Sequence, residues 1–92
     1  MPTADTVAKI RAALERELTP ARLTIEDESA AHAGHAGARE GGHFRLRVVS
    51  ERFRGLTALA RHRLVYEAVA PLMSEGVHAL AIEARTPEEI AQ

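Results

Sequence analysis

The spacing of hydrophobic positions changes along the chain, and each spacing predicts one kind of element. Residues 6–18 carry apolar side chains three and four positions apart, as on one face of an amphipathic helix, and Pro20 ends that pattern. Residues 22–27 and 43–50 alternate apolar with polar positions instead. This alternation predicts two half-buried strands, which we expect to pair as an antiparallel hairpin.

The second half of the chain predicts a long helix, a strand and a short final helix. Thr57 is a good N-cap for a helix over residues 58–74, and Pro71 should bend that helix or end its regular part. Residues 77–85 are almost continuously apolar, which is typical of a central or doubly covered strand. Thr86, followed by a proline and by a glutamate three positions on, predicts the start of a C-terminal helix.

The resulting order is α-β-β-α-β-α, which predicts an α+β fold with a three-stranded mixed sheet and helices packed on one face. We expect residues 1–92 to form a single domain. The connection at 51–55 is polar except for Phe53, which we expect to anchor a short turn against the core. In the last strand, strict alternation places His78 on the same side as Leu80.

The composition excludes several classes of protein and site. The chain has 92 residues, a net charge of −1 and no cysteine. The missing thiols rule out disulfides, a cysteine nucleophile and a self-contained iron–sulfur site. The charge gives no general drive toward nucleic acid or acidic membranes. No apolar run approaches a membrane span and the N-terminus lacks a signal pattern, so we expect a soluble cytoplasmic protein without a membrane partner.

The segment between the first two predicted strands is unusual in composition. Residues 27–44 hold four of the six glycines and three of the five histidines, namely His32, His35 and His43. Loops of this length are uncommon in small domains unless they are functional or disordered, and imidazoles are versatile metal ligands. The segment therefore predicts a ligand-bearing or partner-binding loop, in which we favour a structural or partner-surface role for His43 over a metal-ligand role.

A basic segment follows this loop. Between residues 43 and 63 there are six arginines against one acid. These side chains could meet an acidic protein face, the carboxylates of a small ligand or nucleic-acid phosphate, while a plainly solvated surface remains the alternative. The candidate surface residues are Arg45, Arg47, Arg52, Arg54, Arg61, His62 and Arg63.

Five short blocks, taken together in their order and spacing, are more specific than any single motif. They lie at residues 27–32, 43–45, 48–53, 61–66 and 77–80. In these blocks, and over nearly its whole length, the chain resembles the BolA family. The family's α-β-β-α-β-α fold, which is similar to the class II KH fold, agrees with the order of elements predicted above.

The resemblance implies a partnership with monothiol glutaredoxins, in which a [2Fe–2S] cluster is shared across the heterodimer. Glutathione and a partner cysteine would supply thiolates, and no cluster is expected in the isolated chain. His78 matches the family's histidine ligand at the start of the last strand. His32 best matches the loop ligand, but the loop is long and also carries His35, so either imidazole remains a candidate.

Two functions remain open at this point, and neither is enzymatic. The first is an adaptor that binds a monothiol glutaredoxin and helps coordinate, transfer or sense a [2Fe–2S] cluster. The second is a DNA-binding transcriptional regulator that uses the arginine-rich, KH-like surface, although residues 51–55 lack the Gly-x-x-Gly loop of KH domains. No nucleophile-elbow pattern supports an enzyme. We expect the isolated chain to be a monomer or a weak homodimer.

Overall fold

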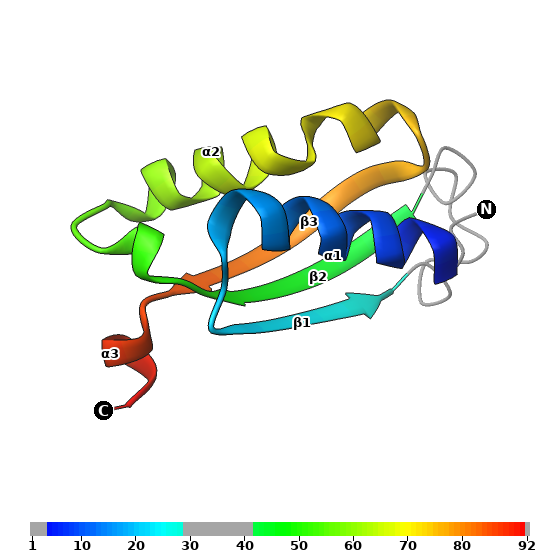
Figure 1. The fold of residues 1–92 in the computed structure, drawn as a ribbon. Helices are drawn as coiled ribbons and strands as arrows, with labels where there is room; N and C mark the ends of the chain where they lie inside the picture. The colour runs from blue at the N-terminus through cyan, green and yellow to red at the C-terminus, as the bar shows by residue number, and fades with distance from the viewer. Residues whose placement is uncertain (1–3, 29–41, 92) are drawn as a thin grey trace.

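The computed structural model describes residues 4–28 and 42–91, which fold as a three-stranded sheet with helices against it (Figure 1). The α-β-β-α-β-α order predicted from the sequence is confirmed. With η marking a 3₁₀ helix, the elements are α1 (Ala4–Leu18), β1 (Arg22–Asp27), β2 (Gly42–Val49), η3 (Glu51–Phe53), α2 (Ala58–Val69), η4 (Ala70–Ser74), β3 (Val77–Arg85) and α3 (Pro87–Ile90).

The sheet is mixed, with β2 in the centre. β1 pairs with β2 in the antiparallel sense and β3 pairs with β2 in the parallel sense, so the strand order is β1-β2-β3. The prediction that residues 77–85 form a central or doubly covered strand is therefore wrong, because β3 lies at an edge. Its apolar character has another cause. Leu80 and Ile82 pack against the core, while the alternating positions hold Ala79 and Ala81, whose small side chains leave little apolar surface uncovered.

The core lies between the sheet and the two longer helices. Phe44, Leu46 and Val48, the inward set of β2, are each at most 1% exposed. Ile10 and Leu14 of α1 are fully buried against them. The two periodicities recognised in the sequence, about 3.6 residues for helices and two for strands, therefore meet in one hydrophobic cluster.

The predicted helix over residues 58–74 has two parts. The hydroxyl oxygen of Thr57 accepts a hydrogen bond from the backbone N–H of Ala60 at 3.1 Å, which confirms the N-cap. The regular helix α2 ends before Pro71, and the chain continues as the 3₁₀ helix η4. This follows from the missing N–H and the ring of proline, which disrupt a regular α-helix.

The connection after β2 is fixed from both sides. Phe53 is fully buried, as expected for an anchor. The Ser50 hydroxyl donates to the carbonyl of Leu18 at 2.7 Å and accepts from the backbone N–H of Arg52 at 3.1 Å. The turn that leads into α2 is thus tied to the end of α1.

The short helix α3 is held by a capping box and by one arginine. The Thr86 hydroxyl accepts from the backbone N–H of Glu89, whose carboxylate accepts in return from the backbone N–H of Thr86. Arg61 of α2 donates to both carboxylate oxygens of Glu89 at 2.7 and 2.9 Å, and to the carbonyls of Ala84 at 3.1 Å and Leu56 at 3.0 Å. Arg61 therefore joins α2, β3 and α3.

These bonds predict a specific acid dependence of stability. Arg61 and the backbone N–H of Thr86 lower the pKa of Glu89 from 4.5 to about 2. Because the folded state favours the charged carboxylate, its stabilising contribution is fully present above pH 4.5 and is lost as the pH falls toward 2. Urea unfolding should show a steeper loss of stability over this interval in the native chain than in Glu89→Gln. Equal slopes would contradict this, and the exposed-site variant Glu15→Gln is the matched control.

Candidate imidazole site

A β-bulge lies where the parallel strands β2 and β3 begin. Gly42 pairs with Val77, but the next residue of β2, His43, pairs with Ala79, so His78 is an extra residue on β3. A bulge of this kind changes the direction of a side chain. Val77 is 3% exposed and lies in the core, whereas His78 is exposed. The strict alternation that placed His78 with Leu80 therefore does not hold at the start of the strand.

The bulge brings two imidazoles together from different strands. The ring centroids of His43 and His78 are 5.3 Å apart and the ring planes are tilted by 56°. His43 is half-buried and His78 is exposed. We call these two side chains the imidazole pair. A hollow of about 260 Å³ adjoins His43 and is also lined by Glu28 and residues 79–81.

The spacing of the imidazole pair is compatible with ligation. Two imidazoles bound to one metal with metal–nitrogen bonds of about 2.1 Å place their ring centres roughly 4.6–5.3 Å apart at angles of about 90–109°. The observed 5.3 Å lies at the upper end of that spacing. Within the described ranges, no group of three or more His, Cys, Asp or Glu side chains could hold a metal ion. Two imidazoles fill only two ligand positions of a metal, so the remaining ligands would have to come from another molecule or another part of the chain.

The surroundings of the imidazole pair are tied to the sheet and locally balanced in charge. The backbone N–H of Glu28 donates to the carbonyl of His43 at 2.7 Å, which joins the end of β1 to the start of β2. The Glu28 carboxylate accepts from Nε of Arg45 at 3.1 Å. The negative charge that lines the hollow is thus offset by a cation on the open face of the sheet.

The predicted ligands have different outcomes. His78 lies in the imidazole pair, while His32 and His35 fall outside the described residues and their ligand role stays a prediction. His43, for which the sequence favoured a structural or partner-surface role, is the neighbour of His78. A pair of strand-start histidines is the only sequence signal for this contact, since the parallel pairing and the bulge have no sequence pattern of their own.

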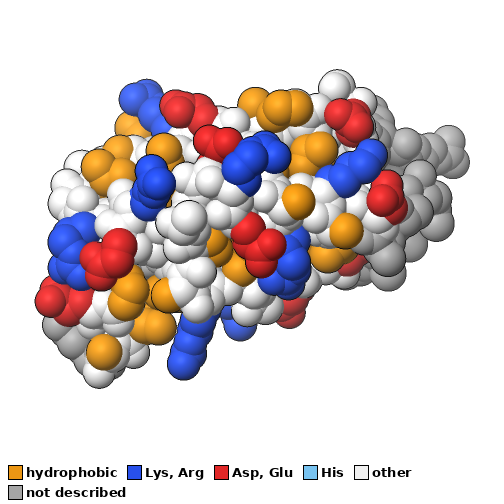
Figure 2. All heavy atoms as spheres, viewed as in Figure 1, with side chains coloured by type: hydrophobic (Ala, Val, Ile, Leu, Met, Phe, Trp, Pro, Cys, Tyr) orange, Lys and Arg blue, Asp and Glu red, His pale blue; other side chains and the backbone are white. Residues whose placement is uncertain are grey.

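The arginines of the basic segment do not form one free cationic surface. Arg52, His62 and Arg63 are exposed and make no ion pair with the described residues. Figure 2 shows the basic side chains on one face of the molecule as separate groups, several of them beside acidic ones. The four arginines held by carboxylates are Arg45 with Glu28 at 3.1 Å, Arg47 with Glu26 at 3.8 Å, Arg54 with Glu51 at 2.8 Å and Arg61 with Glu89 at 2.7 Å.

Comparison with known proteins identifies the family. Residues 14–89 match the family model described as BolA-like protein. The chain belongs to the BolA-like family. A solved structure of the BolA domain of SufE1 from Arabidopsis thaliana superposes on this BolA-like chain with a TM-score of 0.81 and 44% identity, covering 97% of this chain and 99% of that one. The resemblance found in the sequence blocks is confirmed.

Three relatives show the range of proteins that contain such a domain. BolA-like protein 1 of Mus musculus is 50% identical over 82 residues, which are 89% of this chain and 58% of the relative. The SufE-like protein 1, chloroplastic/mitochondrial, of Arabidopsis thaliana is 44% identical over 88 residues, 89% of this chain but 24% of the relative. The DNA-binding transcriptional regulator BolA of Vibrio cholerae is 42% identical over 79 residues, 86% of this chain and 73% of the relative. This BolA-like chain thus spans less than two thirds of the length of each of the first two relatives.

The cellular compartment of the protein is less well determined than its family. In the part of the chain that the structure describes, the helices are too short or too polar to cross a membrane. The name of the SufE-like relative places that protein in chloroplasts and mitochondria. The cytoplasmic location expected from the sequence therefore stays a prediction.

Proposed function

We propose that this BolA-like chain is a non-enzymatic adaptor that binds a monothiol glutaredoxin and helps coordinate, transfer or sense a [2Fe–2S] cluster. The observation that carries the proposal is the imidazole pair, with ring centroids 5.3 Å apart on two adjacent strands. Imidazoles are established ligands of iron, including the iron of Rieske-type clusters.

The chain's own residues define its share of such a site. His78 would supply one nitrogen, and the spacing of the imidazole pair supports His43 as the second ligand, with His32 and then His35 as alternatives from the loop. Because the chain has no cysteine, the thiolates would come from glutathione and a cysteine of the partner. When bound, the cluster supplies electron-transfer and iron–sulfur delivery chemistry, and histidine ligation would raise its reduction potential.

The adaptor proposal is tested by co-expression with a monothiol glutaredoxin. Under anaerobic size-exclusion chromatography we expect a coloured heterodimer whose visible and circular dichroism spectra differ from those of the glutaredoxin alone. A glutaredoxin whose active-site cysteine is replaced by serine is the control and should give a colourless mixture. Separate elution of the two proteins, with the unaltered spectrum of the glutaredoxin, would contradict the proposal.

A second candidate function is binding to DNA, as the name of the Vibrio cholerae relative states for that protein. In this chain, Arg52, His62 and Arg63 are the exposed members of the basic segment that make no ion pair with other described residues. If they contact phosphates, fluorescence anisotropy with labelled duplex should show salt-dependent binding that the double variant Arg52→Glu/Arg63→Glu removes. Absence of binding at low salt would exclude this function, and the double variant Arg11→Glu/Arg22→Glu, at two exposed arginines of α1 and β1, is the charge-matched control.

A further inference from the structure

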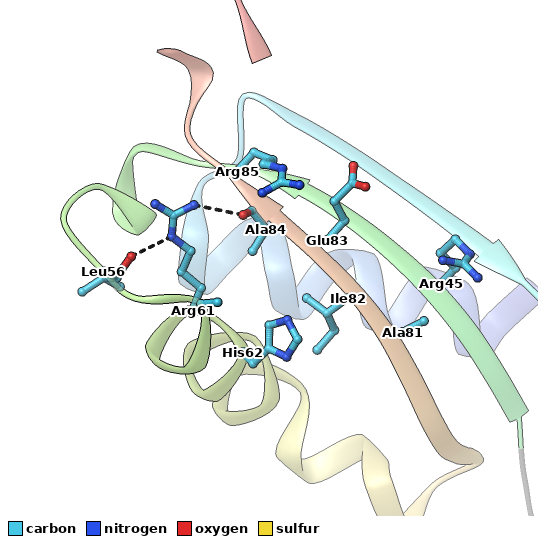
Figure 3. Close-up of a pocket in the computed structure, with 10 residues that line it drawn as sticks. Arg45, Leu56, Arg61, His62, Ala81, Ile82, Glu83, Ala84 and Arg85 are labelled. Atoms are coloured by element: carbon cyan, nitrogen blue, oxygen red, sulfur yellow. Dashed lines mark hydrogen bonds between the residues drawn. The ribbon is translucent and has the colours of Figure 1, made fainter. Parts of the chain in front are cut away.

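The free edge of β3 lies beside α2, and a groove of about 460 Å³ runs between them. Residues 81–85 form its floor on the strand side, and Arg61 and His62 project from α2 on the other side (Figure 3). Arg45, from the neighbouring strand β2, completes the basic lining. We call this feature the α2–β3 groove.

The backbone of β3 presents polar groups to the groove. The carbonyl of Arg85 accepts from the backbone N–H of Ser50 at 2.9 Å, on the side of β2. Successive residues of a strand direct their N–H and C=O groups to opposite edges. The backbone groups of Leu80, Ile82 and Ala84 are therefore directed away from β2, toward the free edge.

Two side chains of α2 already occupy part of this edge. Arg61 donates to the carbonyl of Ala84 at 3.1 Å, and the hydroxyl of Tyr66 donates to the carbonyl of Leu80 at 3.5 Å. Such contacts protect an edge strand from indiscriminate pairing. Between these two contacts, the backbone of Ile82 is left available at the edge. Its N–H and C=O make no hydrogen bond with described residues outside the sheet.

The side chains of the groove favour an acidic occupant. Arg45, Arg61 and Arg85 line the groove together with the single acid Glu83. Glu28 and Glu89, which hold Arg45 and Arg61, are not among the lining residues. Arg85 makes no ion pair with other described residues, and neither does the side chain of His62. No Phe, Tyr or Trp is among the described residues that line the groove, so it lacks the stacking platform typical of single-stranded nucleic-acid sites.

We propose that the α2–β3 groove binds an extended, acidic segment of a partner protein, which adds to β3 as a short strand centred on Ile82. An extended peptide offers N–H and C=O groups at the two-residue repeat that the edge requires, and its carboxylates meet the cations of the groove. The site is independent of the proposed cluster function. The imidazole pair lies at the start of β3, whereas the groove follows the end of that strand.

The probe is a blocked hexapeptide of alternating valine and glutamate, titrated into the ¹⁵N-labelled full chain. We expect the backbone amide signals of Leu80, Ile82 and Ala84 to shift and their hydrogen exchange to slow. A control peptide of the same sequence, methylated at every backbone amide nitrogen, keeps its charges but loses its N–H hydrogen-bond donors. Its affinity should therefore be about tenfold or more lower. No binding at millimolar peptide, equal binding of the methylated peptide, or shifts confined to other elements would each overturn the proposal.

Charge variants and a nucleic-acid probe complete the test. Arg85→Glu and His62→Glu, on opposite sides of the groove, should each weaken peptide binding by about fivefold, since each reverses or adds one charge at the surface. Arg11→Glu on α1 should leave the affinity unchanged. An oligothymidylate that shifts the three edge amides, when the peptide does not, would assign the groove to single-stranded nucleic acid and overturn the peptide proposal.

Discussion

Replacing His78 by alanine is expected to lower the [2Fe–2S] occupancy of the complex between this chain and a monothiol glutaredoxin to a small fraction of its original value. The variant loses the exposed member of the imidazole pair, while His78 lies outside the buried core and its loss should leave the fold intact. Loss of an outer-shell partner lowers the affinity of a metal site roughly 10–100-fold. Because His78 is proposed as a direct ligand, its loss should accelerate cluster release to a chelator by more than that factor. Visible absorption and circular dichroism of the co-purified complex measure both occupancy and release.

Companion variants identify the second ligand. His43→Ala should act in the same direction as His78→Ala if the imidazole pair is the chain's share of the site. A loss confined to His32→Ala or His35→Ala would assign that role to the loop instead. His62→Ala on α2 is the matched control, because it removes an exposed imidazole elsewhere. Unchanged spectra and release rates in both His43→Ala and His78→Ala would refute the assignment of the pair.

Truncating Phe53 to alanine is expected to lower the free energy of unfolding by about 3–5 kcal/mol, the usual cost of removing a buried aromatic ring. The ring is fully buried in the core cluster. It also lies beneath Arg61, whose guanidinium carbon is 6.0 Å from the ring centroid. The substitution would leave a cavity and loosen the turn between β2 and α2. For a small domain with a total stability of roughly 5–15 kcal/mol, such a loss is severe.

Urea unfolding followed by far-ultraviolet circular dichroism measures this effect. Leu59→Ala is the control, because Leu59 on α2 is 61% exposed and its truncation should change stability by less than about 0.5 kcal/mol. If Phe53→Ala and Leu59→Ala cost the same, the anchor role of Phe53 is wrong.

The elements were predictable because they depend on local patterns. Residues 22–27 and 77–85 have the same bounds in the sequence prediction and in the structure, and the capping box at Thr86 was visible as a three-residue spacing. The position of β3 in the sheet was not predictable in this way. Strand order is a tertiary property, and the alanines of β3 resemble a buried strand in composition although they lie on an edge.

The candidate site was predictable only in part. His78 could be singled out from the resemblance, but its contact with His43 depends on parallel pairing and on a bulge of one residue. The basic segment was misleading for a related reason. Charges counted along the chain ignore partners from distant segments, such as Glu28 for Arg45 and Glu89 for Arg61.

The central claim is that imidazoles of this chain ligate a cluster shared with a glutaredoxin. The most direct measurement is pulsed electron paramagnetic resonance of the reduced complex, with ¹⁵N-histidine in this chain and an unlabelled partner. Strong ¹⁵N couplings from two imidazoles are predicted, with one of them lost in His43→Ala. A reduced cluster that shows no ¹⁵N coupling to this chain would contradict the account.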